Sequence, residues 1–467
     1  MIPYSRALPL LMDAASPLGS EWVRRDRSGG RTAARDLQSP EALPPFHNSA
    51  MDGFALALTA AEGQMEGTDA TPEVGPGLWL PVTGRVLAGD PEPRGSGVRP
   101  APQASGVDGV RGRAVEISTG APLPSGCDRV VPIEDVELEA SSGEGPAWIR
   151  LRTRVEEKAN VRPYGGDVAA GRVYLARGHR IGATERALLA ALGVERLPVV
   201  RKPRVAILNT GAELMISPDA PPGPGQIRNS NGPLLQAFFE SWGAEVVMAR
   251  ILPDEVEPFL QALAEIEILD ADLVVTTGAL SRGSRDFVPG ALETAGAQTL
   301  FRKVAIRPGK PLLAARLQAG GLLVGLPGNP GAVAVGTRFF LLPLLRRWAG
   351  WKAEGPLRLP LTGSLELRPG LTYFLAAKIE PDDEGAPRVR VLPDQRSHRL
   401  LPLTRAGCWV VAPPSEGSGD RESGEESTNG FRRISAGDLV EVREWGLNGG
   451  PNEFGGGIGS KAPGESE

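Results

Sequence analysis

The sequence predicts a multidomain α/β and β protein whose central unit is a mostly parallel α/β sandwich domain. Between residues 203 and 350, strand-like apolar runs alternate with segments of helical periodicity, which is the pattern of a parallel sheet covered by helices. Residues 60–150 and 356–445 contain short alternating runs instead, which predict two small β units. A length of 467 residues suits about three domains.

The elements of the α/β unit can be placed in order. A helix starts at Asn231 and stops at Gly243, another follows Asp254, which is placed to cap it, and Asn329 and Pro330 suit the start of the last helix. The predicted strands cover 204–209, 245–251, 272–277, 300–305 and 322–326, and the remaining predicted helices cover 287–295 and 332–348.

The rest of the chain is divided by composition. Residues 5–40 predict a helix followed by more helical, Arg-rich sequence, and residues 158–200 are expected to pack back on it. The segments 91–109 and 415–429 are expected to be loops. The predicted units are a discontinuous N-terminal mixed helical domain (1–50 with 155–200), an inserted small β domain (51–154), the α/β domain (201–350), a C-terminal β-barrel-like domain (351–445) and a disordered tail (446–467).

Composition narrows the class of protein. A net charge of −5 argues against a broad nucleic-acid-binding surface. The two cysteines, Cys127 and Cys408, form no metal motif, and a reducing compartment is the simplest explanation. The N-terminal apolar run is too short for a signal peptide and no apolar stretch approaches a membrane span. We therefore expect a soluble cytoplasmic protein that binds neither nucleic acid nor membrane.

The carboxyl ends of the predicted strands gather polar residues. Ligands bind at this edge in parallel sheets, and the turns Thr210-Gly211, Thr277-Gly278 and Pro327-Gly328 fall there with the acids Glu213, Asp254 and Asp286. Carboxylates can hold magnesium (Mg²⁺), which in turn binds phosphate oxygens. Lys303, Arg307 and Lys310 can balance oxyanion charge. Taken alone, each acid is equally explained as a loop cap or a solvated loop residue, and the turn at 327–330 is equally explained as a plain strand–helix corner.

Other motifs are weak or fail. Asp52 and Thr119 each lie on a predicted turn, which is explanation enough for either residue in isolation. The segment 278–285 has Walker-like glycine spacing but lacks the lysine, and there is no GxGxxG fingerprint. The three histidines are scattered without ligand spacing, so a catalytic triad or a structural zinc site has little support.

Eight segments in order make one family match. They are PPFHNSAMDGFAL, ISTGAPLPSGCDRVV, NVRPYGGDV, VAILNTGAEL, GQIRNSN, DLVVTTGALSRGSRDF, FRKVAIRPGKP and GLPGNP. Over residues 5–445 the chain resembles the molybdopterin molybdenumtransferases, a family that includes the C-terminal domain of gephyrin. The resemblance implies an elongated homodimer with shared active sites. It also implies Mg²⁺-assisted insertion of molybdenum from molybdate into adenylylated molybdopterin, with release of AMP.

The resemblance carries functional roles onto individual residues. It implies functional acids or hydroxyls at Asp52, Thr119, Asp167, Glu213, Asp254 and Asp286, of which Glu213, Asp254 and Asp286 would hold the metal. It implies substrate-binding residues at Ser281, Lys303, Arg307, Lys310, Pro327, Gly328, Asn329, Pro330 and Ser397.

The chain also departs from the family pattern. Ala279 stands where a second glycine is usual, Arg282 adds a charge nearby, and Arg285 precedes Asp286 where an acidic or small residue is usual. Arg396 stands where glycine is usual, and the NVR segment continues with Pro163, Tyr164 and Gly166. These changes keep open a pterin- or nucleotide-binding relative with a different reaction. A scaffolding protein on the same fold is a further alternative, since the resemblance includes gephyrin, whose domain also anchors receptors.

Overall fold

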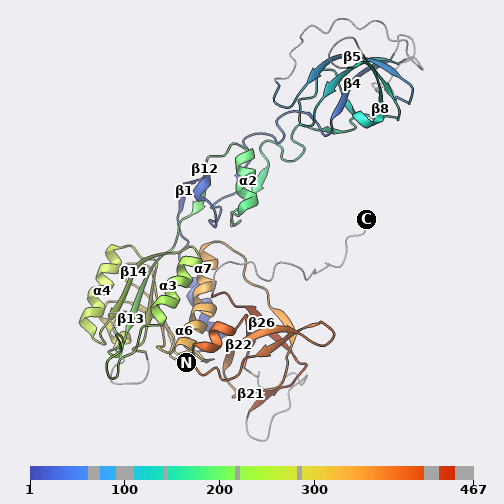
Figure 1. Cartoon of the computed structure of the whole chain (residues 1–467). Coiled ribbons are helices and arrows are strands. Elements are labelled where there is room, and N and C mark those ends of the chain that lie inside the picture. Colours follow the sequence, from blue (N-terminus) through green and yellow to red (C-terminus); the bar gives the residue numbers. More distant parts are fainter. Residues whose placement is uncertain are drawn as a thin grey trace.

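The computed structural model describes residues 1–60, 74–90, 110–140, 146–215, 221–280, 287–414 and 431–447. Figure 1 shows an elongated molecule. One β unit, which carries β4 (Gly53–Ala60), β5 (Trp79–Val86) and β8 (Val136–Ala140), lies at the far end from the larger body. A connecting part with β1 (Ser20–Arg24), β12 (Arg196–Val200) and α2 (Ala183–Ala191) lies between them. The predicted loops at 91–109 and 415–429 lie outside the described residues.

The α/β unit is a six-stranded sheet with the order β14-β13-β15-β19-β18-β16. The pairings among β14, β13, β15 and β19 are parallel, whereas β18 is antiparallel to both β19 and β16. The strands are β13 (Arg204–Thr210), β14 (Glu245–Leu252), β15 (Leu273–Thr277), β16 (Gln298–Arg302), β18 (Leu313–Arg316) and β19 (Leu322–Leu326). The predicted alternation and the strand at 322–326 are confirmed, and the sheet is mostly parallel with an antiparallel edge.

Both faces of this sheet are covered by apolar side chains. On one face Val205, Ile207 and Val275 join one buried cluster, and on the other Ala206 and Leu208 join a second. This follows from the two-residue period of a strand, which sends neighbouring side chains to opposite faces. The covering helices are α3 (Asn231–Ser241), α4 (Val256–Ile268), α5 (Val288–Thr294), α6 (Pro330–Gly336) and α7 (Leu342–Trp348).

Several predicted elements differ in detail. The helix expected at 332–348 begins at Pro330 and contains a π-helical stretch, Thr337–Leu341. The helical sequence expected up to residue 40 is wrong beyond α1 (Tyr4–Ala14), because the chain then forms β1, a 3₁₀ turn (Arg25–Arg27) and β2 (Leu37–Gln38). Pro17 and Gly19 explain this end, since neither residue favours a helix interior.

The connecting part is made of short antiparallel pairs. β1 pairs with β12, β2 with β11 (Val173–Leu175), and β3 (Asn48–Ser49) with β10 (Val161–Arg162). Residues 20–49 and 161–200 thus fold together, whereas α1 joins the main apolar cluster of the α/β unit through Ala7, Leu11 and Ala14. The expected packing of 158–200 on the N-terminal helix is replaced by this strand pairing.

The inserted β unit is a six-stranded sheet with the order β7-β4-β6-β5-β9-β8. Its remaining strands are β6 (Val110–Ile117), β7 (Arg129–Pro132) and β9 (Pro146–Leu151). A short 3₁₀ turn, Ile133–Asp135, links β7 to β8.

The C-terminal unit is built on a third six-stranded sheet with the path β17-β22-β24-β26-β20, with β23 paired to β22. Its strands are β20 (Leu357–Pro360), β22 (Thr372–Pro381), β23 (Pro387–Val391), β24 (Cys408–Ala412) and β26 (Leu439–Glu444), beside a small pair of β21 (Leu365–Leu367) and β25 (Arg432–Ile434) and the short helix α8 (Leu401–Arg405). β17 (Ile306–Arg307) comes from the predicted α/β range but pairs in parallel with β22. The chain therefore links the two units through a strand that carries Arg307.

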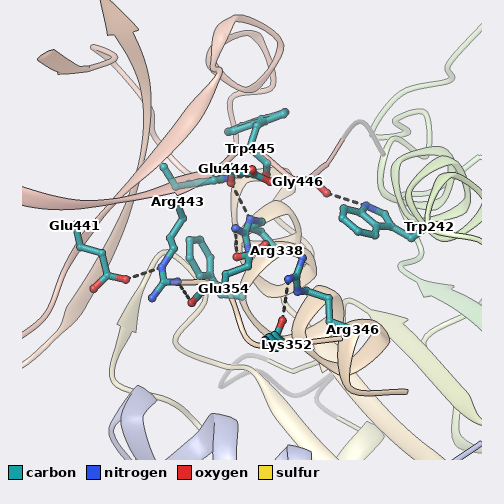
Figure 2. Close-up of polar contacts among 12 residues, drawn as sticks. Trp242, Arg338, Arg346, Lys352, Glu354, Glu441, Arg443, Glu444, Trp445 and Gly446 are labelled. Atoms are coloured by element: carbon teal, nitrogen blue, oxygen red, sulfur yellow. Dashed lines mark hydrogen bonds and ion pairs between the residues drawn. The ribbon is translucent and has the colours of Figure 1, made fainter. Parts of the chain in front are cut away.

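A buried polar network also holds the C-terminal sheet on the helices (Figure 2). The Arg338 side chain is 2% exposed, ion-pairs with Glu354 at 2.6 Å and donates to the Glu444 carbonyl at 2.8 Å. Arg443 donates to the Glu354 carbonyl at 2.6 Å. The Trp242 indole donates to the Gly446 carbonyl at 3.0 Å, so the expected tail begins with packed residues. Residues 448–467 lie outside the described range.

Candidate functional site

A large cleft lies where the carboxyl ends of the α/β strands face the C-terminal unit. Its volume is about 1420 Å³. Six segments supply most of its wall: the ends of β13 and β15, the turn 327–330 after β19, the turn 307–311 after β17, and the C-terminal segments 365–368 and 395–400. The sheet edge that the sequence predicts as a ligand site is therefore one wall of a real cleft.

The ends of β13 and β15 are held together tightly. The Thr210 hydroxyl donates to the Thr277 carbonyl at 3.1 Å, and the Thr277 hydroxyl donates to Asn209 Oδ1 at 2.9 Å. A Cβ at Gly278 would lie 2.3 Å from the Thr210 carbonyl oxygen, and Gly278 has a φ of +93°. Only glycine fits at this position. The two hydrogen bonds and this close approach hold the ends of β13 and β15 together at the cleft.

The turn 327–330 is fixed from two sides. Asn231 Nδ2 donates to the Gly328 carbonyl at 2.7 Å, and Asn329 Nδ2 donates to Ser397 Oγ at 3.2 Å. α6 starts at Pro330 with Asn329 at the N-cap position, as predicted, but the Asn329 side chain makes no capping hydrogen bond. It reaches instead to the C-terminal unit, so the turn joins the two walls of the cleft.

Two of the predicted acids lie side by side at adjacent strand ends. Glu213 lines the cleft, and its carboxylate lies against Gly211, where a Cβ would be 2.8 Å from Glu213 Oε1. Asp254 Oδ2 accepts from the Ala212 backbone N–H at 3.1 Å. The predicted capping role of Asp254 is wrong, since the residue at the N-cap of α4 is Glu255 and the Asp254 carboxylate turns to the neighbouring strand.

Carboxylate oxygens such as those of Glu213 and Asp254 are the ligands that Mg²⁺ prefers. Within the described ranges no group of three or more His, Cys, Asp and Glu side chains is placed to hold a metal ion. Asp286, the third predicted metal ligand, and Ser281 lie outside those ranges. The carboxylates of Glu213 and Asp254 fit a hard cation in chemistry, and both approach neighbouring residues of one turn, Glu213 at Gly211 and Asp254 at the Ala212 N–H.

The predicted basic residues divide into two groups. Arg307 and Lys310 are exposed and line the cleft, and the Arg307 guanidinium lies 5.9 Å from the ring centre of Tyr373. Lys303 is not among the lining residues. Its backbone N–H donates to the Leu312 carbonyl at 2.9 Å, at the base of the loop whose tip carries Arg307.

Sequence reasoning missed Arg228, Arg368 and Arg399 as cleft residues and noted Arg396 only as a departure from the family pattern. Arg228, Arg368, Arg396 and Arg399 line the cleft, whereas Glu213 and Glu366 are the acidic residues among those that line it. Arg228 lies in the GQIRNSN segment, and this family motif could have indicated that Arg228 belongs to the site. Arg368 and Arg399 lie in turns of the C-terminal unit, where no strand end or motif marked them. The wall is therefore more positive than predicted.

The remaining predicted residues form a second cluster at the base of the inserted β unit. Asp52 Oδ1 accepts from the Thr119 backbone N–H at 2.7 Å, and Gly120 N–H donates to the Ser49 carbonyl at 2.8 Å. Asp167 is exposed nearby on the chain that follows β10, which pairs with β3. The inserted β unit lies at the far end of the molecule from the α/β and C-terminal units, which line the cleft (Figure 1). The structure thus brings Asp52 and Thr119 together but does not join them to Glu213.

Three family models cover most of the chain. Residues 2–193 match the MoeA N-terminal region (domains I and II), residues 206–347 match a probable molybdopterin binding domain, and residues 358–445 match the MoeA C-terminal region (domain IV). A molybdopterin molybdenumtransferase from Synechococcus elongatus is 36% identical over 419 residues, which is 89% of this chain and 96% of that protein. The relative of the same name from Bacillus subtilis is 35% identical over 348 residues, 74% of this chain and 75% of its own length.

A solved structure agrees with these relatives. The crystal structure of the molybdopterin biosynthesis MoeA protein from Pyrococcus horikoshii superposes with a TM-score of 0.72 at 26% identity, covering 95% of this chain and 99% of its own. The fold is thus that of a multidomain MoeA-like protein. The chain belongs to the molybdopterin molybdenumtransferase family. Across the described residues, none of the helices has the length and apolar character needed to cross a bilayer.

Proposed function

We propose that this chain inserts molybdenum from molybdate into the dithiolene of adenylylated molybdopterin and releases AMP. The observation that carries the proposal is the cleft itself. The cleft is lined by Glu213, Arg307, Lys310, the turn 327–330 and Ser397. All of these except Ser397 fall within residues 206–347, which match the probable molybdopterin binding domain. A volume of about 1420 Å³ is ample for a nucleotide-linked pterin.

The charges of the cleft suit this substrate pair. Arg307 and Lys310 can bind the phosphate oxygens of the nucleotide or molybdate, which is a small dianion. Glu213 and Asp254, with Asp286, would hold Mg²⁺. When bound there, the ion would polarise the phosphoanhydride and neutralise charge on the departing AMP. Asn231 keeps the turn 327–330 in place through the Gly328 carbonyl, so the phosphate-facing backbone needs little rearrangement when substrate binds.

A second copy of the chain would complete the site. Asp52 and Thr119 are held together by a hydrogen bond and are exposed. They flank strands of the inserted β unit, which lies at the far end of the molecule from the α/β and C-terminal units (Figure 1). In the proposed homodimer they and Asp167 face the cleft of the partner copy. Cytoplasmic location and the absence of nucleic-acid and membrane partners stay predictions.

The test is AMP release from adenylylated molybdopterin by the purified protein, with molybdate and Mg²⁺. Glu213→Gln is expected to reduce the rate at least a hundredfold, while Glu267→Gln, on the exposed side of α4, keeps it. A folded protein that releases no AMP above background contradicts the proposal.

Complementation tests the shared site. A mixture of Glu213→Gln and Asp52→Asn proteins, unfolded and refolded together, should regain activity because a mixed dimer contains one intact site. Each variant refolded alone should stay inactive, and a mixture without recovery contradicts the homodimer.

A further inference from the structure

We propose that Trp351 is a positioning residue for the reaction, because it fixes the connecting part beside the end of α7 and so sets where the inserted β unit holds Asp52 and Thr119. Those two residues belong to the site only on the proposed function, and the inference rests on it in that respect. How Trp351 holds the two units together is a property of one chain, and it can be measured without turnover.

The connecting part is attached to the α/β unit by two short stretches of chain. Residues 15–19 lead from α1 into β1, and residues 201–203 lead from β12 into β13. The Arg201 N–H donates to the Gly19 carbonyl at 2.9 Å, so the two stretches are bonded to each other. The Arg201 guanidinium also donates to both carboxylate oxygens of Asp272, at 2.7 and 2.5 Å. This attachment holds the units together, but two adjacent stretches of chain alone still allow rotation about them.

A second contact lies just after α7, where two backbone turns touch. A Cβ at Gly178 would lie 2.7 Å from the Gly350 carbonyl oxygen, and the two residues have φ values of +82° and +74°. Only glycine allows this approach. It brings the turn that follows β11 of the connecting part against the residue before Trp351.

The Trp351 side chain contacts two residues of the connecting part that are paired with each other. Its indole N–H donates to Thr32 Oγ1 at 3.1 Å, and the Arg180 guanidinium lies over its ring, 5.6 Å from the ring centre. Thr32 and Arg180 are partners in an antiparallel β-bridge. Trp351 therefore contacts both chain segments of the connecting part, residues 20–49 and residues 161–200, at one place.

On the α/β side the same ring is contacted by two further side chains. The Arg346 guanidinium of α7 lies over it at 5.8 Å, and the Trp242 ring, at the end of α3, lies 6.0 Å away. Arg346 is itself held, because it donates to the Lys352 carbonyl at 2.8 Å and lies 3.4 Å from the Glu354 carboxylate. The ring is thus shared between the two units, with one guanidinium from each, and forms what we call the Trp351 joint.

The charge of Arg180 favours this arrangement. Burial lowers the pKa of the Arg180 guanidinium, and among the described residues it has no carboxylate partner. The face of an indole attracts a guanidinium, and the attraction is larger when the cation is partly desolvated. Removing the Trp351 ring therefore removes the group that stabilises this charge and weakens the contact between the connecting part and α7.

The Trp351 joint matters because of what the connecting part carries. The inserted β unit lies beyond it at the far end of the molecule (Figure 1), and Asp52 accepts the Thr119 N–H there at 2.7 Å. A small rotation at the joint therefore becomes a larger displacement at Asp52 and Thr119. Misplacing a reacting group by about 1 Å can lower a rate about a hundredfold. In the proposed homodimer, Trp351 thus determines how well these two residues meet the cleft of the partner copy.

Pulsed electron paramagnetic resonance tests the joint directly. Spin labels at Ala190→Cys on α2 and Glu267→Cys on α4 report the distance between the two units, since both positions are exposed and the natural cysteines are buried. Labelled protein is diluted with unlabelled protein, so that the distance lies within one chain. We expect one narrow distribution for the otherwise unchanged chain and a broader or shifted one for Trp351→Ala.

A second variant and a matched control separate this effect from a general loss of stability. Thr32→Val combined with Arg180→Met leaves Trp351 in place but removes its partners in the connecting part, and should broaden the distribution as Trp351→Ala does. Trp22→Ala is the control. Trp22 also lies under a guanidinium, that of Arg35 at 5.4 Å, but both residues belong to the connecting part, so the distribution should stay that of the wild type.

Kinetics of AMP release test the positioning role. Trp351→Ala should lower kcat about tenfold and leave KM for adenylylated molybdopterin nearly unchanged, because the substrate binds in the cleft and not at the joint. Trp351→Phe, which keeps a ring for Arg180, should recover part of the loss. A wild-type distance distribution in folded Trp351→Ala overturns the inference, and so does a broadened distribution with unchanged kcat. A wild type that releases no AMP contradicts the proposed function instead, while the distances still decide whether Trp351 holds the joint.

Discussion

Replacing Gly331 by alanine should loosen the contact that closes the cleft. A Cβ at Gly331 would lie 3.0 Å from the carbonyl oxygen and 3.2 Å from the Cα of Ser397, and both are backbone atoms that cannot turn away. The segment 394–399 must therefore move by a few tenths of an ångström. That shift also strains the 2.8 Å hydrogen bond from the Gly331 N–H to the Ser397 carbonyl.

The magnitude follows from three contributions. Overpacking costs about 1–3 kcal/mol, and weakening the hydrogen bond costs up to about 1 kcal/mol. Alanine in place of glycine in a helix returns about 1 kcal/mol. The free energy of unfolding should thus fall by up to about 3 kcal/mol, and kcat/KM for AMP release should fall about tenfold because Ser397 and Arg396 are displaced together.

Hydrogen exchange of the segment 392–400, with urea unfolding beside it, measures both effects. Gly290→Ala is the matched control, because Gly290 lies in α5 with open space around its Cβ position and should only gain helix propensity. Gly331→Ala with wild-type exchange in 392–400 and wild-type stability would refute the reasoning about this contact.

Three further substitutions test other parts of the structure. Glu354→Ala leaves the buried Arg338 guanidinium without its carboxylate and should lower the free energy of unfolding by about 3 kcal/mol or more in urea denaturation; a loss below 1 kcal/mol would contradict this. Ala279 has a φ of +48°, which costs an alanine about 1–2 kcal/mol. Ala279→Gly relieves this strain but costs about 0.5–1 kcal/mol in backbone entropy, so the melting temperature should rise slightly. A lower melting temperature would show that the packing of the Ala279 methyl group stabilises the fold more than the strain destabilises it. The pKa of Glu185 would be raised by burial alone, but hydrogen bonds from the Glu185 backbone N–H, His179, Gly182 and Thr184 lower it to about 2. A lowered pKa stabilises the fold above the unfolded value of 4.5 and loses this effect as pH falls towards 2. Glu185→Gln should thus cost about 1 kcal/mol at pH 7, discounted for its surface position, and the difference should shrink below pH 4.5; a pH-independent difference would refute the assignment.

The α/β unit was predictable because its signals are local. The strand at 322–326 is a continuous apolar run that ends in Pro-Gly, and both features are readable without the fold. The antiparallel edge was not, because β18 is the alanine-rich run Leu313–Arg316, which has little β propensity of its own. It is a strand because β19 and β16 pair with it on either side.

The site was predictable to the same extent. Glu213 and the turn 327–330 follow strand ends, so the topology alone places them at one edge. Lys303 shares a motif with Arg307, but the loop that carries both has Lys303 at its base, away from the cleft lining. Arg368 and Arg399 enter the cleft only because the C-terminal sheet docks through β17, and no local pattern encodes that contact.

The most direct test of the central claim counts molybdenum and AMP in the same reaction. Wild-type protein with adenylylated molybdopterin, molybdate and Mg²⁺ should incorporate about one molybdenum per AMP released, with the stoichiometry read by elemental mass spectrometry and chromatography. Glu213→Gln should abolish both products together, since the cleft is the proposed site of both events. AMP release without molybdenum incorporation, or full activity in folded Glu213→Gln, would contradict the claim that this cleft performs the transfer.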